Sequence, residues 1–171
     1  MIFLGCASKT PMTTGIIYDV GVENATAFQY YVSKPITLTL VTEERTSEVR
    51  KGRLHSRSRV AKNKIVIKEK LPGIALRHEN WIDGRIGLAV AFEKKDGEPT
   101  LYFSPNPNFP NDQRQFLNYA DPENLIVVYG ADRYRVSFDS KKRSEQPYLL
   151  IKSKQRSKQT AQARNAKGMR L

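Results

Sequence analysis

The sequence has one cysteine, few acidic residues and no long apolar run. A single cysteine among 171 residues excludes an intramolecular disulfide and a cysteine-rich zinc site. No run approaches 18 consecutive apolar residues, so no transmembrane helix is predicted. Hydrophobic residues make up 39% of the chain, which at this length is enough to bury a core without metals or disulfides. These totals indicate one globular domain with tails.

Motifs of the common enzyme classes are also missing. The chain has no GxxxxGK[ST], GxGxxG or HExxH motif, and it has no GxSxG nucleophile elbow. Its only histidines are His55 and His78. We therefore expect no cofactor, no metal site and no catalytic residue, and we expect a binding or scaffolding protein rather than an enzyme.

Positive charge is concentrated at the C-terminal end. The net charge is +12, and residues 140–171 hold ten Lys or Arg against one acid, Glu145. That segment carries +9, which leaves +3 for residues 1–139. The sequence is thus divided into a leader or tether (1–14), a β-rich domain (15–151) and a basic tail without a core-facing stripe (152–171).

Period-two alternation dominates the domain. Strands are expected at 16–21, 36–42, 53–60, 63–70, 71–77, 85–93, 100–104, 125–138 (a hairpin) and 146–152. One helix is expected at 24–34, with Asn24 as N-cap and Pro35 as its end. Residues 105–124 are expected to form a long loop with a helical turn near 113–119. This pattern predicts an antiparallel β-sandwich or small barrel with one short N-terminal helix, and the alternative is an α+β roll.

Cys6 lies in a pattern typical of lipid attachment. Phe3-Leu4-Gly5-Cys6, followed by Ala7-Ser8, resembles the lipobox of bacterial lipoproteins, in which the cysteine receives diacylglycerol. A secretory signal also needs a basic segment and seven or more apolar residues, but only five residues precede Cys6 and none is basic. We therefore expect Met1 to be an internal methionine. The alternative is that Cys6 is a small buried hydrophobic residue.

The domain itself resembles a group of lipoproteins. The segments FQYYVSKPITLTL (28–40), LPGIAL (71–76), IGLAVAFE (86–93) and LYF (101–103) look like those of small secreted lipoproteins of spirochaetes and Bacteroidetes. The resemblance covers about residues 16–138 and carries no catalytic residue. It implies a lipid-anchored location in the bacterial cell envelope, at the outer membrane or facing the periplasm. The alternative location is the cytoplasm.

Two regions are candidate binding sites. Six cations, expected on one face of adjacent strands, form a candidate site for an anionic partner such as a glycan, a lipid headgroup or a nucleic acid: Arg53, Arg57, Arg59, Lys62, Lys64 and Lys68. The alternative is a solvated face whose lysines protect an edge strand. The second candidate is a ligand loop with His78, Glu79, Trp81 and Asp83, for which the alternative is a core tryptophan and an Asp83-Gly84 turn.

Three functions follow from these features. The first is a lipid-anchored β-domain that binds or scaffolds at the envelope, attached to the membrane through Cys6. The second is a cytoplasmic nucleic-acid-binding protein that uses the basic stretch 45–70 and the tail, with an affinity that falls steeply with salt. The third is a hydrolase that uses carboxylates within residues 77–98 around a pocket at Trp81.

Overall fold

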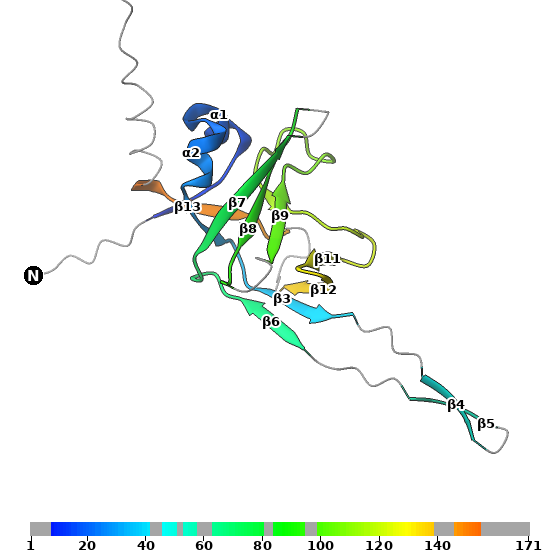
Figure 1. Ribbon diagram of the computed structural model, residues 1–171. Coiled ribbons are helices and arrows are strands. Elements are labelled where there is room, and N and C mark those ends of the chain that lie inside the picture. The colour runs from blue at the N-terminus through cyan, green and yellow to red at the C-terminus, as the bar shows by residue number, and fades with distance from the viewer. Residues whose placement is uncertain are drawn as a thin grey trace, which may run out of the picture.

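The computed structural model describes residues 8–41, 46–50, 53–57, 63–80, 84–94, 99–138 and 146–154, the second and third of these ranges as backbone only. Over these residues the fold is mainly β, with two antiparallel sheets, a separate hairpin and two short helices (Figure 1). Neither sheet closes into a barrel among the described strands. The expected antiparallel, sandwich-like fold is confirmed.

The two sheets are built from strands that are distant in the sequence. The large sheet has the order β1 (Lys9–Pro11), β13 (Leu149–Lys152), β2 (Gln29–Val32), β7 (Gly73–Asn80), β8 (Ile86–Ala91), β9 (Thr100–Ser104), β10 (Phe116–Leu117). The small sheet has the order β11 (Ile126–Tyr129), β12 (Asp132–Phe138), β3 (Ile36–Leu40), β6 (Lys64–Ile67). The separate hairpin consists of β4 (Thr46–Arg50) and β5 (Arg53–Arg57).

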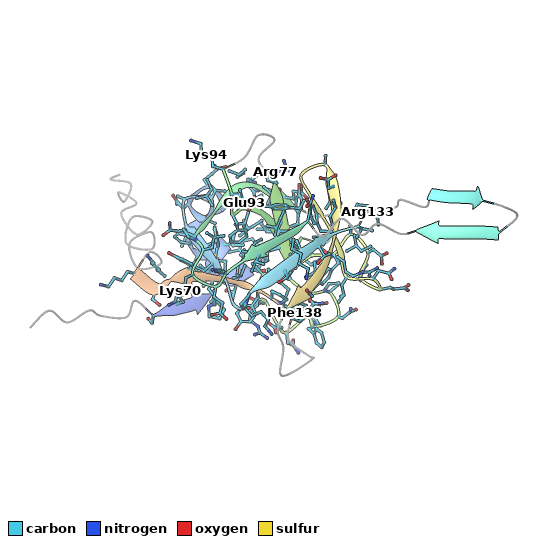
Figure 2. All side chains as sticks on the ribbon, turned by 90° about the horizontal axis from the view of Figure 1, so that it is seen from below. Lys70, Arg77, Glu93, Lys94, Arg133 and Phe138 are labelled. Carbon is cyan, nitrogen blue, oxygen red and sulfur yellow. The ribbon has the colours of Figure 1, made fainter. Side chains whose placement is uncertain are left out.

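The core joins the two sheets. Leu88 and Phe103 of the large sheet belong to the same buried cluster as Ile36 and Leu38 of the small sheet. Burying a side chain of this size contributes about 1.5–3 kcal/mol. Charged side chains such as Lys94 and Arg133 point outward (Figure 2). The alternation of apolar and polar residues along the strands therefore places the core where the sequence predicts it.

The N-terminal region differs from the sequence-based expectation. Residues 16–21, expected as a strand, lie mainly in helix α1 (Thr14–Val20), and the helix expected at 24–34 is reduced to α2 (Val22–Thr26). The hydroxyl of Thr13 caps α1 by accepting from the Ile16 backbone N–H at 3.2 Å. This cap and a buried helical face outweigh the β-propensity of the isoleucines and valine. Residues 29–32 form β2 because two neighbouring strands, β13 and β7, pair with them.

The folded part also begins earlier than expected. Residues 9–11, expected in the leader, form edge strand β1 and pair with β13. Met12, the next residue, is fully buried. The expected boundary between residues 14 and 15 is therefore too late, because the pairing partner of β1 comes from the far end of the chain.

The remaining strand predictions agree well with the structure. Strand β8 is buried along its whole length, and it pairs with β9 as expected for a hairpin. The hairpin of β11 and β12 turns at Gly130, whose φ of 68° favours glycine. The helical turn expected near 113–119 is wrong, because Phe116 and Leu117 form β10 and pair with β9.

The large sheet is curved so that its two edges approach each other. Single bridges join Thr13 to Arg114 and Phe116 to Tyr148. The Met12 carbonyl accepts a hydrogen bond of 3.0 Å from the Gln115 N–H. These contacts hold the loop before β10 against the segment between β1 and α1, and they position the site described below.

One register is common to the small sheet and the separate hairpin. Ile36 of β3 faces Ile67 of β6, and Thr46 of β4 faces Arg57 of β5. Thr46 lies ten residues after Ile36 in the sequence, and Arg57 lies ten residues before Ile67. The two ladders therefore have the pairing expected of consecutive parts of one ribbon.

Candidate functional site

Several residues that the sequence singled out lie outside the described part of the chain. These are Cys6, Arg59, Lys62, Trp81 and Asp83. The basic tail beyond Lys154 also lies outside it. The predictions for the lipid site, for half of the ligand loop and for the tail therefore remain predictions.

The strands expected to form one basic face do not pair with each other. Arg53 and Arg57 lie in β5, which pairs with β4, whereas Lys64 lies in β6, which pairs with β3. Lys68 follows β6 and is exposed. The expectation that these strands are adjacent is therefore wrong, because β5 and β6 belong to different sheets. Anion binding by these residues stays a prediction.

The ligand loop predicted around residues 77–85 is partly a strand. His78 and Glu79 belong to β7, where they face Leu88 and Gly87 of β8. Both are partly exposed, and Glu79 lies 3.9 Å from Arg77 in an exposed ion pair. Successive residues of a strand point to opposite faces, so His78 and Glu79 do not converge on one ligand.

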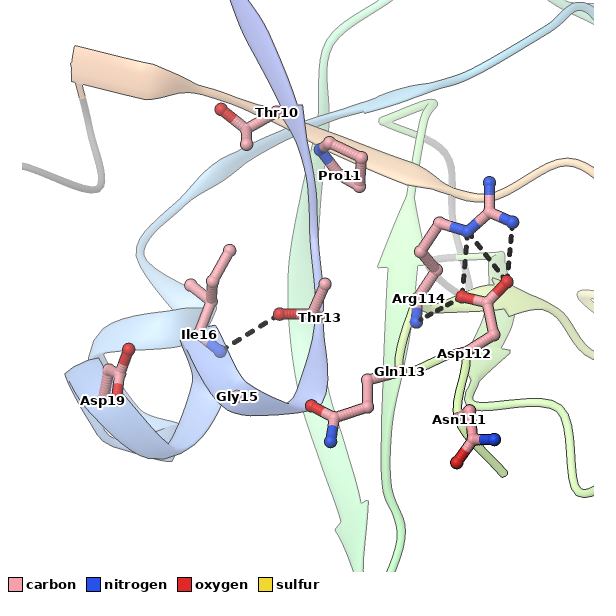
Figure 3. Close-up of a pocket in the computed structure, with 10 residues that line it drawn as sticks. All are labelled: Thr10, Pro11, Thr13, Gly15, Ile16, Asp19, Asn111, Asp112, Gln113 and Arg114. Carbon is pink, nitrogen blue, oxygen red and sulfur yellow. Dashed lines mark hydrogen bonds and ion pairs between the residues drawn. The ribbon is translucent and has the colours of Figure 1, made fainter. Parts of the chain in front are cut away.

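A site that the sequence analysis missed lies along the loop between β9 and β10. Three adjoining hollows follow residues 104–119, and together we call them the loop groove. The first, of about 520 Å³, lies between residues 10–19 and 111–114 (Figure 3). The second, of about 340 Å³, is lined by Gly84, Arg85 and residues 105–113. The third, of about 200 Å³, is lined by Arg85, residues 104–108 and 116–119, Pro122 and Gln146.

Two polar contacts anchor the loop that lines the groove. Gln115 is fully buried. Its amide nitrogen donates to the carbonyls of Phe103 and Ile86, each at 3.2 Å, and its amide oxygen accepts from Thr14 Oγ1 at 3.3 Å. The Thr14 N–H donates to the Gln113 carbonyl at 3.0 Å. A buried amide with all its partners is costly to disturb, so the loop is held rigidly against the start of α1.

Arg114 is the best-anchored charged residue of the loop groove. Its Nε lies 2.9 Å from Asp112 Oδ1, and its Nη2 lies 2.6 Å from Asp112 Oδ2 (Figure 3). The guanidinium lies 4.9 Å from the ring centroid of Phe116 and 4.6 Å from that of Tyr148. A two-point ion pair with aromatic contacts restricts the side chain more than a single exposed pair does.

This ion pair predicts a titration. Hydrogen bonds from Arg114 hold the pKa of the Asp112 carboxyl below its usual 3.8. Because the folded value is lowered, the pair stabilises the fold above the unfolded pKa and loses that contribution as the pH falls through the folded value. Carbon-13 NMR should show Asp112 titrating below 3.8, and Arg114→Ala should return the midpoint toward 3.8. An unchanged midpoint in the variant would contradict the pairing.

The lining of the loop groove is rich in amides. Six Asn or Gln side chains contribute to the three hollows: Asn106, Asn108, Asn111, Gln113, Asn118 and Gln146. Phe109 borders the second hollow and is 60% exposed. Tyr119 also lines the third hollow, and its hydroxyl is buried without a hydrogen-bond partner among the described residues. Burial raises the pKa of Tyr119 to about 12, so the phenol keeps its proton at neutral pH.

The signal that would have found this site is loop length. Loops longer than about 12–15 residues are uncommon inside a compact domain and are usually either functional or linkers, so the loop expected at 105–124 marks a place to look for a site. The asparagines and prolines of residues 105–124 suit an irregular backbone with exposed amides. The sequence alone does not show that β1 and α1 form the opposite wall, because that depends on the contact between the two sheet edges.

The described ranges were compared with the requirements of a metal site and of a membrane-spanning helix. There, no group of three or more His, Cys, Asp or Glu side chains is placed to hold a metal ion. Of the helices that the structure describes, none has the length and apolar character needed to cross a bilayer.

Comparison with known proteins gives no relative from which to transfer a function. No protein-family model, curated protein or solved structure matches this chain. The fold places the chain in the broad class of β-sandwich-like domains, which host many unrelated functions. The function must therefore be argued from the surfaces of this molecule.

Proposed function

We propose that this chain is a lipid-anchored protein of the bacterial cell envelope, whose β-domain binds a ligand close to the membrane. The observation that supports this most is the position of Cys6 relative to the fold. The lipobox-like cysteine precedes the first strand, β1, by three residues, and β1 is an edge strand. A lipid on Cys6 would hold this edge of the domain next to the bilayer.

The charge of that edge fits this orientation. Four lysines, which we call the lysine edge, lie on β1, at the end of β13 and in the turn after β6: Lys9, Lys70, Lys152 and Lys154. Lys9 Nζ donates to the Glu69 carbonyl at 3.0 Å and lies 4.0 Å from the ring centroid of Tyr31. Figure 2 shows Lys70 beside β1 and β13. Lysines near an anionic membrane contribute about 1 kcal/mol each.

Metabolic labelling tests the anchor directly. Bacteria that express the gene with its natural upstream sequence are grown with an alkyne-bearing fatty acid, and the purified protein is coupled to a fluorophore. We expect a labelled band in the membrane fraction, because acyl chains keep a protein at the bilayer when a second signal assists them. An unlabelled protein would overturn the proposal.

The register of the separate hairpin favours a second candidate, a cytoplasmic nucleic-acid-binding protein. Arg50 pairs with Arg53 in the ladder of β4 and β5, and Arg57 at the other end of β5 pairs with Thr46. His55 lies midway between these two arginines of β5 and pairs with Glu48. A two-stranded ribbon fits the major groove of duplex DNA, where arginines bind phosphates and guanine edges.

Salt dependence tests the second candidate. Filter binding of a 20-base-pair DNA should show an affinity whose logarithm falls linearly with the logarithm of the salt concentration. Replacing Arg50, Arg53 and Arg57 with alanine should reduce that slope by about 2–3, since each lost phosphate contact removes roughly 0.9. A control variant with alanine in place of Lys64, Lys68 and Lys94 tests whether the change in slope is specific to the hairpin. Absence of retention at low salt would remove this candidate.

A further inference from the structure

The loop groove has the properties of a carbohydrate-binding site. It is elongated, because its neighbouring hollows share lining residues: Asp112 and Gln113 join the first to the second, and Arg85 and residues 105–107 join the second to the third. The volumes of the first two hollows, about 520 and about 340 Å³, lie in the range of small-molecule sites, and the third adds about 200 Å³. A chain of several small rings fits such a row of hollows better than one compact ligand does.

The polar lining matches hydroxyl groups. Each Asn or Gln side chain offers two N–H donors and a carbonyl acceptor in one plane, and neighbouring hydroxyls of a sugar need a donor and an acceptor side by side. Amides line all three hollows.

An aromatic ring and three prolines supply the apolar part of the site. Phe109 is 60% exposed between Pro107 and Pro110 and faces the second hollow with Pro105. An exposed aromatic ring can cover the C–H face of a sugar ring and remove apolar surface from water. The fixed φ of proline restricts the loop before the ligand arrives, which lowers the entropic cost of binding.

The charge balance favours a neutral ligand. Arg85 and Arg114 are the cations that line the loop groove, and Asp19 and Asp112 are the carboxylates. Arg114 is bound by Asp112 at two points, so its charge is already compensated. A phosphate or sulfate polymer would need an excess of positive charge, which this groove does not offer.

The sheet edges disfavour an extended peptide. Such a peptide usually adds to a free strand edge through backbone hydrogen bonds. Here β10 pairs with β9 on one side, and on the other side it is bridged to Tyr148. The backbone next to the groove is therefore already occupied.

We propose that the loop groove binds a neutral oligosaccharide, with Phe109 stacked on a sugar ring and the amide side chains of the lining bonded to sugar hydroxyls. This inference names the ligand class of the binding function proposed above, and it does not depend on the lipid. The Cys6→Ser chain can be purified without an anchor, so failure of the sugar test and failure of the labelling test are separate results.

One variant and two controls test the carbohydrate site. The Cys6→Ser chain is applied to an array of neutral oligosaccharides that includes cello-, chito-, malto- and manno-tetraoses, and the best one is titrated by calorimetry. Phe109→Ala should weaken binding about ten-fold, which corresponds to about 1.4 kcal/mol. Ile74→Ala removes a similarly exposed apolar side chain (56%) outside the groove, so it should leave binding unchanged.

Tyr119→Phe is a second control. It deletes the hydroxyl without changing the ring, so the melting temperature should stay the same or rise, because an unpartnered buried group is removed. Sugar binding should stay the same, because this hydroxyl is buried and not open to the groove. The proposal is overturned if no neutral oligosaccharide on the array binds, or if binding is the same in the native and Phe109→Ala proteins.

Discussion

A Cys6→Ser chain should lose its fatty-acid label and move from the membrane fraction to the soluble fraction. Serine is close to cysteine in size, but it lacks the thiol to which diacylglycerol is attached. Burial of acyl chains contributes about 0.8 kcal/mol per CH₂, so removing the lipid removes the dominant membrane term. Fractionation and fluorophore coupling measure the two effects in the same cells.

The lysine edge provides the matched control for this experiment. If it contributes a second signal, Lys9→Glu with Lys152→Glu should leave the label intact and weaken binding of the lipidated protein to anionic vesicles, mainly at low salt. Vesicles of neutral lipid should show no difference. A Cys6→Ser protein that keeps its label, or that stays fully membrane-bound in 1 M salt, would contradict the anchor.

Phe103→Ala should lower the free energy of unfolding by about 3–5 kcal/mol. Phe103 is fully buried in β9, where it faces Leu88 of β8 and Leu117 of β10. Its ring also meets Phe92 edge to face, at 6.4 Å between centroids. Alanine loses the transfer free energy of the ring and leaves a cavity between three strands. In a domain of this size the melting temperature should fall by roughly 6–20 °C.

Phe109→Ala is the matched control, because it makes the same chemical change at an exposed position. Since Phe109 is 60% exposed, the variant should unfold within about 0.5 kcal/mol of the native protein. Urea denaturation of both variants measures the difference. Equal destabilisation by the two substitutions would mean that Phe103 does not lie in the core.

Much of the fold follows from alternation in the sequence, and the exceptions have local causes. Strands β3 and β12 alternate apolar and polar residues, so their presence and their inward faces are predictable. In α1, Ile16, Ile17 and Val20 suit a strand equally well, and the deciding feature is the Thr13 cap. The choice between helix and strand in such a short segment is decided by one hydrogen bond and by the packing around it.

The candidate site was harder to predict than the fold. The amides and prolines after β9 are visible in the sequence, but their opposite wall comes from residues 10–19, about 100 positions away. The basic residues of β5 and β6 were expected on one face of adjacent strands. Their pairing depends on the register of the ribbon, which charge patterns do not encode.

The common register of the small sheet and the hairpin also makes the hairpin adjustable in length. Deleting Thr46 and Ser47 together with their partners Arg57 and Ser56 would remove two residues from each strand. The residues that remain would keep their faces, because a shift of two restores the side-chain alternation. Deleting one pair would turn every outer residue to the opposite face. Insertions and deletions in steps of two pairs thus give evolution a way to change the reach of the hairpin while the domain stays intact.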